Sequence, residues 1–115
     1  MDGVYFRTGE HAFRFLKFDD EKICNEILKC SNPYDARNVG RKYIDLRLSN
    51  WVEVKYGLLE KVFSAKVEQN PIVRECLLNT FDYTICEYCV DEDTEWGLDS
   101  NGNGENRLGR ALMNV

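Results

Sequence analysis

The sequence lacks several features that would assign it quickly to a class of protein. No apolar run approaches the roughly 20 residues that a membrane-spanning helix needs, and no basic-then-apolar signal peptide stands at its start. Only 2 Pro and 8 Gly occur in 115 residues, which excludes collagen-like and disordered chains. With 43% hydrophobic and 30% charged residues, the composition is that of a globular domain, which we expect in the cytoplasm.

Basic residues are missing from one stretch, 91–105, which contains six acidic residues and no Lys or Arg. The rest of the chain is nearly neutral, so this stretch accounts for most of the net charge of −5. No Lys/Arg stripe suited to non-specific binding of duplex nucleic acid is visible. The acidic stretch leaves one interpretation open, an interaction protein that presents Trp96 from this loop to a basic partner.

The 5 cysteines and the single histidine form no recognisable metal site. An odd cysteine count without a signal peptide argues against a disulfide framework. Cys86 and Cys89 form a lone C-x-x-C, with no second ligand pair at a suitable spacing. Residues 99–104 match the first half of a calcium loop, but Arg110 stands where that loop needs a bidentate Glu. We therefore expect neither a metal nor another cofactor.

Helix start signals and apolar periodicity predict a mostly helical α+β fold in a single domain over residues 1–115. Two segments alternate like strands, 42–48 weakly and 81–90 more clearly, so we expect one small β-sheet. The helices are predicted at about 9–18, 20–30, 33–40, 51–68 and 71–79, with a last helix capped by Asn106.

The first predicted helix carries Glu10 and Lys17, which are seven residues apart and therefore lie on nearly the same face. An axial offset of about 10 Å prevents a direct ion pair, but the two side chains can line one pocket at two heights. On these residues alone, a solvated Glu and a solvated Lys is the simpler interpretation. His11 points about 100° away from Glu10 and is predicted to be structural.

Six short motifs follow one another along the whole chain. They are an opening like D-G-x-x-Y-x-T-x-E-H-x-x-x-x-x-K at Asp2–Lys17, with Phe6 at the Tyr position, Gly40-Arg41, Trp51 at the start of the long helix, Gln69-Asn70 at its end, the D-x-x-W-G of Asp93–Gly97, and the G-x-N-x-L-G-x-x-L-M of Gly104–Met113. In kind and order these motifs resemble those of the NADAR/YbiA-like family. Family members usually carry a leading segment before the first motif, which forms part of one pocket wall, and this sequence is expected to lack it.

The resemblance implies an N-glycosidase, which hydrolyses the C–N bond between a ribose or ADP-ribose and a nitrogenous base. The implied substrate classes are ADP-ribosylated guanine, including guanine carried on nucleic acid, and riboflavin-pathway ribosylamine phosphates. One alternative remains open, a catalytically silent module that binds ADP-ribose or a nucleotide. Neither interpretation involves a membrane or an obligate protein partner.

Carried over by position, the resemblance implies a catalytic set of Lys17, Glu10 and Asp93. Lys17 would be the nucleophile that forms a Schiff base with the ring-opened sugar, Glu10 the acid/base, and Asp93 the group that holds the ribose. The substrate-binding residues implied in the same way are Thr8, Arg41, Trp51, Trp96, Gly97 and Asn106.

A nucleophilic lysine must be neutral, so its surroundings have to lower its pKa by burial or by a nearby cation. We expect Phe13 and Phe18 to supply apolar walls around Lys17. Arg14 or Arg41 is expected to supply the nearby positive charge, and either guanidinium would also suit a substrate phosphate. The sequence alone does not choose between the two arginines.

Overall fold

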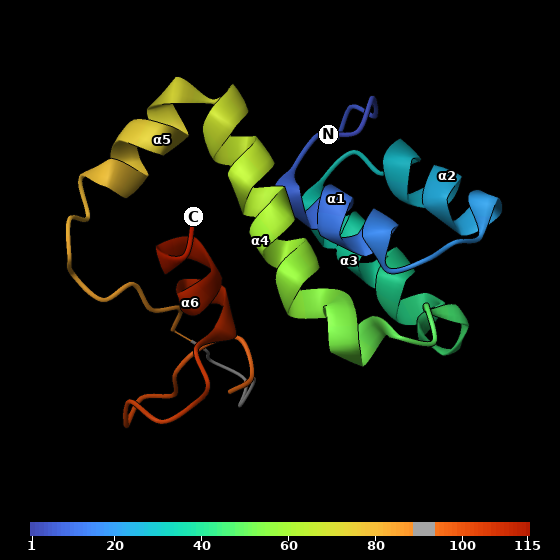
Figure 1. Ribbon diagram of the computed structural model, residues 1–115. Coiled ribbons are helices and arrows are strands. Elements are labelled where there is room, and N and C mark those ends of the chain that lie inside the picture. The colour runs from blue at the N-terminus through green and yellow to red at the C-terminus, as the bar shows by residue number, and fades with distance from the viewer. Residues whose placement is uncertain (89–93) are drawn as a thin grey trace. The chain divides into compact units, whose positions relative to one another are not determined.

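The computed structural model describes residues 1–88 and 94–115, which form helices joined by turns and irregular segments (Figure 1). All six predicted α-helices are confirmed to within two residues at each end. In these described ranges, no helix is both long enough and apolar enough to cross a bilayer. The elements are α1 (Gly9–Leu16), α2 (Glu21–Lys29), α3 (Pro33–Lys42), the 3₁₀ helix η1 (Ile44–Leu46), α4 (Trp51–Gln69), α5 (Pro71–Leu78) and α6 (Arg107–Met113).

Capping side chains and prolines explain where the helices begin. Thr8, Asp20 and Asn32 precede α1, α2 and α3, and each side chain accepts a hydrogen bond from backbone N–H groups of the first turn. Pro33 and Pro71 lie at the start of α3 and α5. The backbone N–H that proline lacks would have no partner within the helix at this position. The local sequence therefore sets these boundaries without help from distant contacts.

The weak strand predicted at 42–48 is wrong. Helix α3 continues past Gly40 to Lys42, and residues 44–46 then form η1. The backbone N–H of Leu46 donates to the carbonyl of Tyr43 at 2.9 Å, so the hydrogen bonds of this segment are local. Alternation over a few residues predicts a strand only where another strand is available to pair with it.

The strand predicted at 81–90 does not form in its described part. Residues 81–83 form a turn, and Tyr88 makes only an isolated parallel bridge with Leu98. Residues 89 and 90 lie outside the described part of the chain. The small β-sheet is therefore not confirmed, and the regular structure of the described residues is helical.

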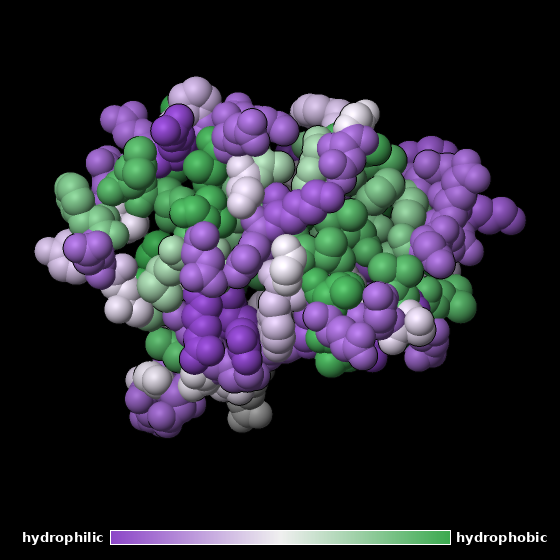
Figure 2. All heavy atoms as spheres, viewed as in Figure 1, coloured by the Kyte–Doolittle hydropathy of each residue, from purple (hydrophilic) through white to green (hydrophobic). Residues whose placement is uncertain are grey.

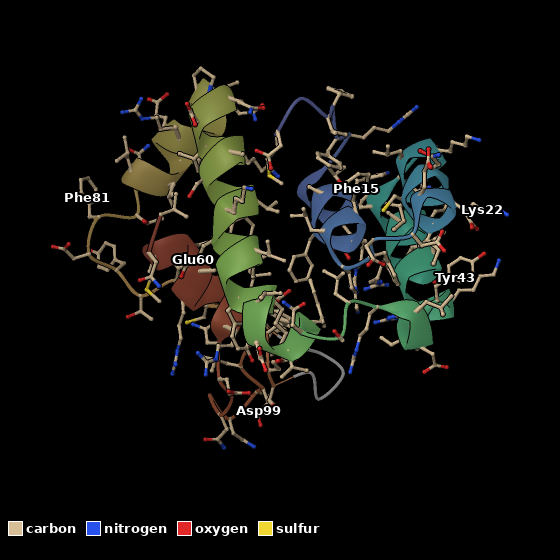
Figure 3. The ribbon with its side chains drawn as sticks, turned by 45° about the vertical axis from the view of Figure 1, so that its right-hand side comes forward. Phe15, Lys22, Tyr43, Glu60, Phe81 and Asp99 are labelled. Atoms are coloured by element: carbon tan, nitrogen blue, oxygen red, sulfur yellow. The ribbon has the colours of Figure 1, made fainter. Side chains whose placement is uncertain are left out.

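The chain divides into two compact units, residues 1–58 and 59–115. In the first unit, α1, α2 and α3 all pack against one another (Figure 1). Lys22 points from α2 away from their shared core (Figure 3). The buried core residues are Phe18, Ile23, Cys24, Ile27 and Ala36.

The second unit contains the later part of α4 with α5 and α6, and its buried apolar residues include Leu59, Val62 and Ala111. The Asn114 amide donates to the carboxylate of Glu60 at 2.9 Å, which joins the end of α6 to α4. Many apolar side chains stay exposed, and Figure 2 shows hydrophobic residues at the surface around α5. Phe81, one of these, points outward (Figure 3). A single domain over residues 1–115 stays a prediction.

Candidate active site

One side of α1 carries the site. Glu10 lies in its first turn, Arg14 follows four residues later, and Lys17 caps its end with right-handed helical backbone angles. Residues three and four apart are neighbours on a helix surface, so the three side chains form a row. Arg14 stands in this row between the carboxylate of Glu10 and the amine of Lys17.

Glu10 and Arg14 form a close ion pair. Arg14 Nε donates to Glu10 Oε1 at 2.7 Å; the Arg14 side chain is 17% exposed and the Glu10 side chain 32%. A charge-assisted bond of this length fixes the carboxylate more firmly than the usual solvated i,i+4 pair does. The site therefore holds Glu10 in one position while leaving part of its carboxylate accessible.

Lys17 is buried, being only 5% exposed, and its amine lies over an aromatic ring. Nζ is 5.3 Å from the centre of the Trp51 ring, which in turn packs on Phe13 at 5.1 Å between ring centres. The backbone reinforces this arrangement, because Leu48 N–H donates to Lys17 O at 2.9 Å and Trp51 N–H donates to Leu48 O at 3.1 Å. Trp51 thus lies beside the amine, while Phe13 packs on the Trp51 ring, and its role as a wall around Lys17 stays a prediction.

These surroundings lower the pKa of Lys17 from its usual 10.5 to about 8. Burial is the largest cause, because it disfavours the charged ammonium, and the positive charges of Arg14, Arg47 and Lys55 follow. The carboxylate of Glu10 acts in the opposite direction but is the weakest influence. A substantial fraction of this lysine is consequently neutral near pH 8, whereas an ordinary lysine would be almost fully protonated.

Sequence reasoning named only Arg14 or Arg41 as the cation for Lys17 and missed Arg47 and Lys55. Arg47 lies just before α4, and Lys55 lies one turn into that helix. The spacing of Lys55 four residues after Trp51 was a usable signal, since it places both side chains on one face of α4. No comparable signal marked Arg47, because its position depends on how residues 47–50 return the chain to α1.

His11 has the structural role that was predicted for it. Its side chain is fully buried, with Nδ1 2.7 Å from Thr8 Oγ1 and Nε2 2.9 Å from the carbonyl oxygen of Cys30. A carbonyl only accepts, so in the neutral ring Nε2 donates to Cys30 and the Thr8 hydroxyl donates to Nδ1. This chain of bonds ties the start of α1 to the end of α2 and thereby positions Glu10.

The remaining predicted residues of the first unit differ in their surroundings. Thr8 is engaged with His11, by its hydroxyl bond and as the helix cap, so its contact with a substrate stays a prediction. Arg41 is exposed on α3, and its role as a phosphate ligand also stays a prediction. Phe18 lies in the core of α1, α2 and α3 with Ile27.

In the second unit, Asn106 is 7% exposed, and its left-handed backbone (φ 50°) breaks the usual pattern of a helix cap. Its side chain makes no cap bond, so the predicted side-chain cap is wrong. The amide instead donates to Ile85 O at 2.8 Å and accepts from Glu87 N–H at 3.2 Å. Gly97 lies against the Glu87 backbone, where a Cβ atom would come within 2.6 Å of the carbonyl oxygen.

Trp96 is half-buried in the same unit. Substrate contacts of Trp96, Gly97 and Asn106 stay predictions, as does a pocket shared by Trp96 and Trp51. The third predicted catalytic residue, Asp93, lies outside the described residues. Among residues 1–88 and 94–115, no group of three or more His, Cys, Asp or Glu side chains is arranged to hold a metal ion.

The whole chain matches one family of domains, and it belongs to that family: the NADAR domain family, whose model matches residues 1–115. The chain is 38% identical to N-glycosidase YbiA of Shigella boydii, over 100% of this chain and 71% of that protein. It is 28% identical to a riboflavin biosynthesis protein of Vibrio vulnificus, over 100% of this chain and 31% of that protein. The chain is also similar to the solution structure of Escherichia coli YbiA, with a TM-score of 0.87 and 38% sequence identity. The match covers 99% of this chain and 67% of the YbiA chain.

Proposed function

We propose that this protein is an N-glycosidase that hydrolyses the C–N bond between a phosphorylated ribose, or ADP-ribose, and a nitrogenous base. The observation that carries the proposal is the buried amine of Lys17, which lies over Trp51 and has a pKa of about 8. Glu10 provides a carboxylate on the same helix. The names of the similar proteins, N-glycosidase and riboflavin biosynthesis protein, support the same class of reaction.

Lys17 acts as the nucleophile. Its neutral amine attacks the anomeric carbon, the bond from that carbon to the base breaks, and opening of the sugar ring yields a protonated imine. Water then adds to the imine carbon and releases the sugar as its aldehyde, which regenerates the neutral amine, and the proton that water gives up ends on the former ring oxygen as its hydroxyl. Burial of the amine, together with the positive charges of Arg14, Arg47 and Lys55, favours the neutral form that this attack requires.

Glu10 and Asp93 handle protons and the sugar. Cleavage of an N-glycosidic bond needs a proton for the departing nitrogen, and Glu10 delivers it. Asp93 stabilises the positive charge that develops at the anomeric carbon and holds the ribose hydroxyls. The remaining contacts are proposed from Thr8, Arg41, Trp51, Trp96, Gly97 and Asn106.

The substrate is a small ribosyl-base molecule or an ADP-ribosyl group carried on guanine of a nucleic acid. No cofactor enters the proposed reaction, because the amine and two carboxylates supply its chemistry. A chain that only binds ADP-ribose or a nucleotide has no need of a neutral lysine, and the lowered pKa of Lys17 therefore favours catalysis.

The test offers the protein two substrates separately: an oligonucleotide bearing ADP-ribosylated guanine, and the riboflavin-pathway ribosylamine phosphate. Release of free base from either, with a sugar adduct on Lys17 trapped by borohydride and seen as a mass increase, is the expected result. Lys17→Arg keeps the charge but forms no imine, and should lower turnover by at least about 10³-fold.

Lys22→Arg is the matched control, because Lys22 is an exposed lysine that points away from the core (Figure 3). It should keep full activity and give the same adduct on Lys17. Binding of either ligand without turnover would replace the enzyme with a silent binding module. Turnover by Lys17→Arg without any adduct would instead indicate direct attack by water.

A further inference from the structure

The side chain of Arg14 crosses from α1 to α3 and rests on Gly40. Gly40 is buried, and a Cβ atom built on it would lie 2.9 Å from Arg14 Cδ and 3.5 Å from Arg14 Cγ. The first of these distances is closer than real Cβ contacts permit. The arginine stem therefore occupies the space that any other residue at position 40 would fill.

Gly40 sits in a helix, where glycine is unfavourable by about 1 kcal/mol relative to alanine, and its backbone has ordinary helical angles. Backbone freedom thus does not explain this glycine. Gly57 offers a comparison, because it also lies inside a helix, α4, but nothing comes within 4 Å of a Cβ built there. The distinctive feature of Gly40 is its contact with Arg14.

The contact with Gly40 determines where the guanidinium of Arg14 lies. With its stem against Gly40, Arg14 directs Nε to Glu10 Oε1 at 2.7 Å and stands one turn before Lys17. We propose that Arg14, seated on Gly40, is a positioning residue of the reaction: it fixes the Glu10 carboxylate, and Gly40 is required because a side chain there would displace it. This inference rests on the proposed N-glycosidase function and goes beyond it.

The ion pair defines the order in which protons move. Glu10 begins as the carboxylate partner of Arg14, so it cannot also be the initial proton donor. When the neutral amine of Lys17 attacks the anomeric carbon, it acquires a positive charge and releases one proton. Glu10 accepts that proton and passes it to the departing base nitrogen, so that the amine, the carboxylate and the leaving group balance without an external acid.

Arg14 also acts on the amine. Its positive charge is, after burial, the largest influence that lowers the pKa of Lys17. The other charged groups that influence the amine are Arg47 and Lys55, which also lower this pKa, and Glu10, which raises it. Loss of Arg14 should therefore move the rise of kcat with pH to a higher pH, in addition to loosening Glu10.

A double-mutant cycle tests the contact between Arg14 and Gly40. Gly40→Ala alone should lower kcat about 10- to 100-fold, the cost of a small displacement of a catalytic group, with KM changed less than about threefold. Arg14→Ala removes Cγ and Cδ, so adding Gly40→Ala to it should change kcat by less than about twofold. Gly57→Ala is the matched control and should leave kcat unchanged. Compared with Arg14→Ala, Arg14→Lys should retain part of the activity because lysine keeps the positive charge.

A second readout needs no substrate. The rate at which an amine-reactive acylating reagent modifies Lys17, followed by mass spectrometry across pH, reports the titration of that amine in each variant. Arg14→Ala should shift this profile to higher pH, and Gly57→Ala should not. If no variant, including the wild type, turns over either substrate, the proposed function fails while this profile still decides the role of Arg14.

The inference is overturned by either of two results. The first is that Gly40→Ala leaves kcat unchanged, or that it lowers kcat by the same factor in the Arg14→Ala protein as in the wild type. The second is an Arg14→Ala protein whose Lys17 profile coincides with that of the wild type. Circular dichroism of each variant checks that the helices are intact, so that a folding defect is not taken for a positioning effect.

Discussion

The two units of this chain organise their residues in different ways. In residues 1–58, three helices share a buried core, and the polar side chains of His11 and Lys17 are buried as well. Both ring nitrogens of His11 have hydrogen-bond partners, and the amine of Lys17 lies over Trp51. In residues 59–115, large apolar side chains such as Ile72 and Phe81 are about four-fifths exposed. A groove of about 660 Å³ lies among the apolar residues of this second unit.

This difference shows where the chemistry gains its precision. The pKa of a lysine falls where burial or neighbouring cations disfavour its charged form, and both act on Lys17. The first unit supplies these surroundings through Trp51 and the α1 contacts. The second unit holds its turn of residues 94–106 mainly through backbone hydrogen bonds, which fix a path for the chain without a large core.

The comparison is tested most strongly by replacing the two tryptophans. Trp51→Ala removes a ring that is 4% exposed and packs on Phe13 and Lys17. It should cost about 3–5 kcal/mol of unfolding free energy and most of the activity. Trp96→Ala should weaken substrate binding while leaving the thermal midpoint nearly unchanged. Urea denaturation and substrate titration of both variants measure these effects, and a larger stability loss at Trp96 would reverse the comparison.

A second pair compares isoleucines. Ile27 is fully buried, whereas Ile72 is 78% exposed. Ile27→Ala should destabilise the chain by about 2–5 kcal/mol, and Ile72→Ala by less than about 0.5 kcal/mol. Both values come from the midpoint and slope of denaturant unfolding. Equal losses at the two positions would show that Ile72 is covered in solution.

Asn106 sharpens the comparison from the second unit. Asn106→Ala leaves the Ile85 carbonyl and the Glu87 N–H without their partner, and should cost about 1–3 kcal/mol. Asn106→Gly loses the same bonds but relieves the left-handed backbone, so it should be the less damaging of the two changes. Hydrogen exchange of the Glu87 N–H, which donates to the Asn106 side chain, would report the local loss. Identical stability of the alanine variant and the wild type would contradict the bonding described here.

The last effect concerns the pH dependence of stability. The folded pKa of Lys17 is about 8 and its usual value 10.5, so between these pH values the unfolded chain binds more protons and stability rises with pH. The free energy of unfolding of the wild type relative to Lys17→Met should rise by about 1–3 kcal/mol across this interval, since one pKa unit corresponds to about 1.4 kcal/mol. Denaturation at several pH values measures it, and a flat difference would mean an unperturbed lysine.

Much of the helical framework was predictable because its signals are local. Thr8, Asp20 and Asn32 cap helices within their own first turns, and Pro33 and Pro71 mark helix starts. The strand predicted at 42–48 is wrong, and the one predicted at 81–90 is not found in its described part, because pairing depends on a partner strand that local alternation cannot reveal. Asn106 illustrates the limit, since its amide bonds residues about twenty positions earlier in the chain.

The candidate site was predictable to the same extent. Spacing placed Glu10 and Lys17 on one side of a helix, and the family motifs indicated Trp51. The role of Gly40 was not predictable, because a glycine inside a helical pattern gives no sign of which side chain rests on it. The influence of Arg47 on Lys17 depends likewise on tertiary structure, whereas Lys55 had a spacing signal that went unused.

The backbone hydrogen bond from Leu48 N–H to the Lys17 carbonyl limits where residues can be inserted into or deleted from the chain. Residues 47–50 connect that hydrogen bond to Trp51, the first residue of α4, so the number of residues in this segment is fixed. One residue added or removed there would turn the start of α4 by about 100° and carry the indole ring away from the amine. The exposed tip at Asn101 and Gly102 has no such constraint. Insertions should therefore be tolerated at 101–102 and should inactivate the protein at 48–50.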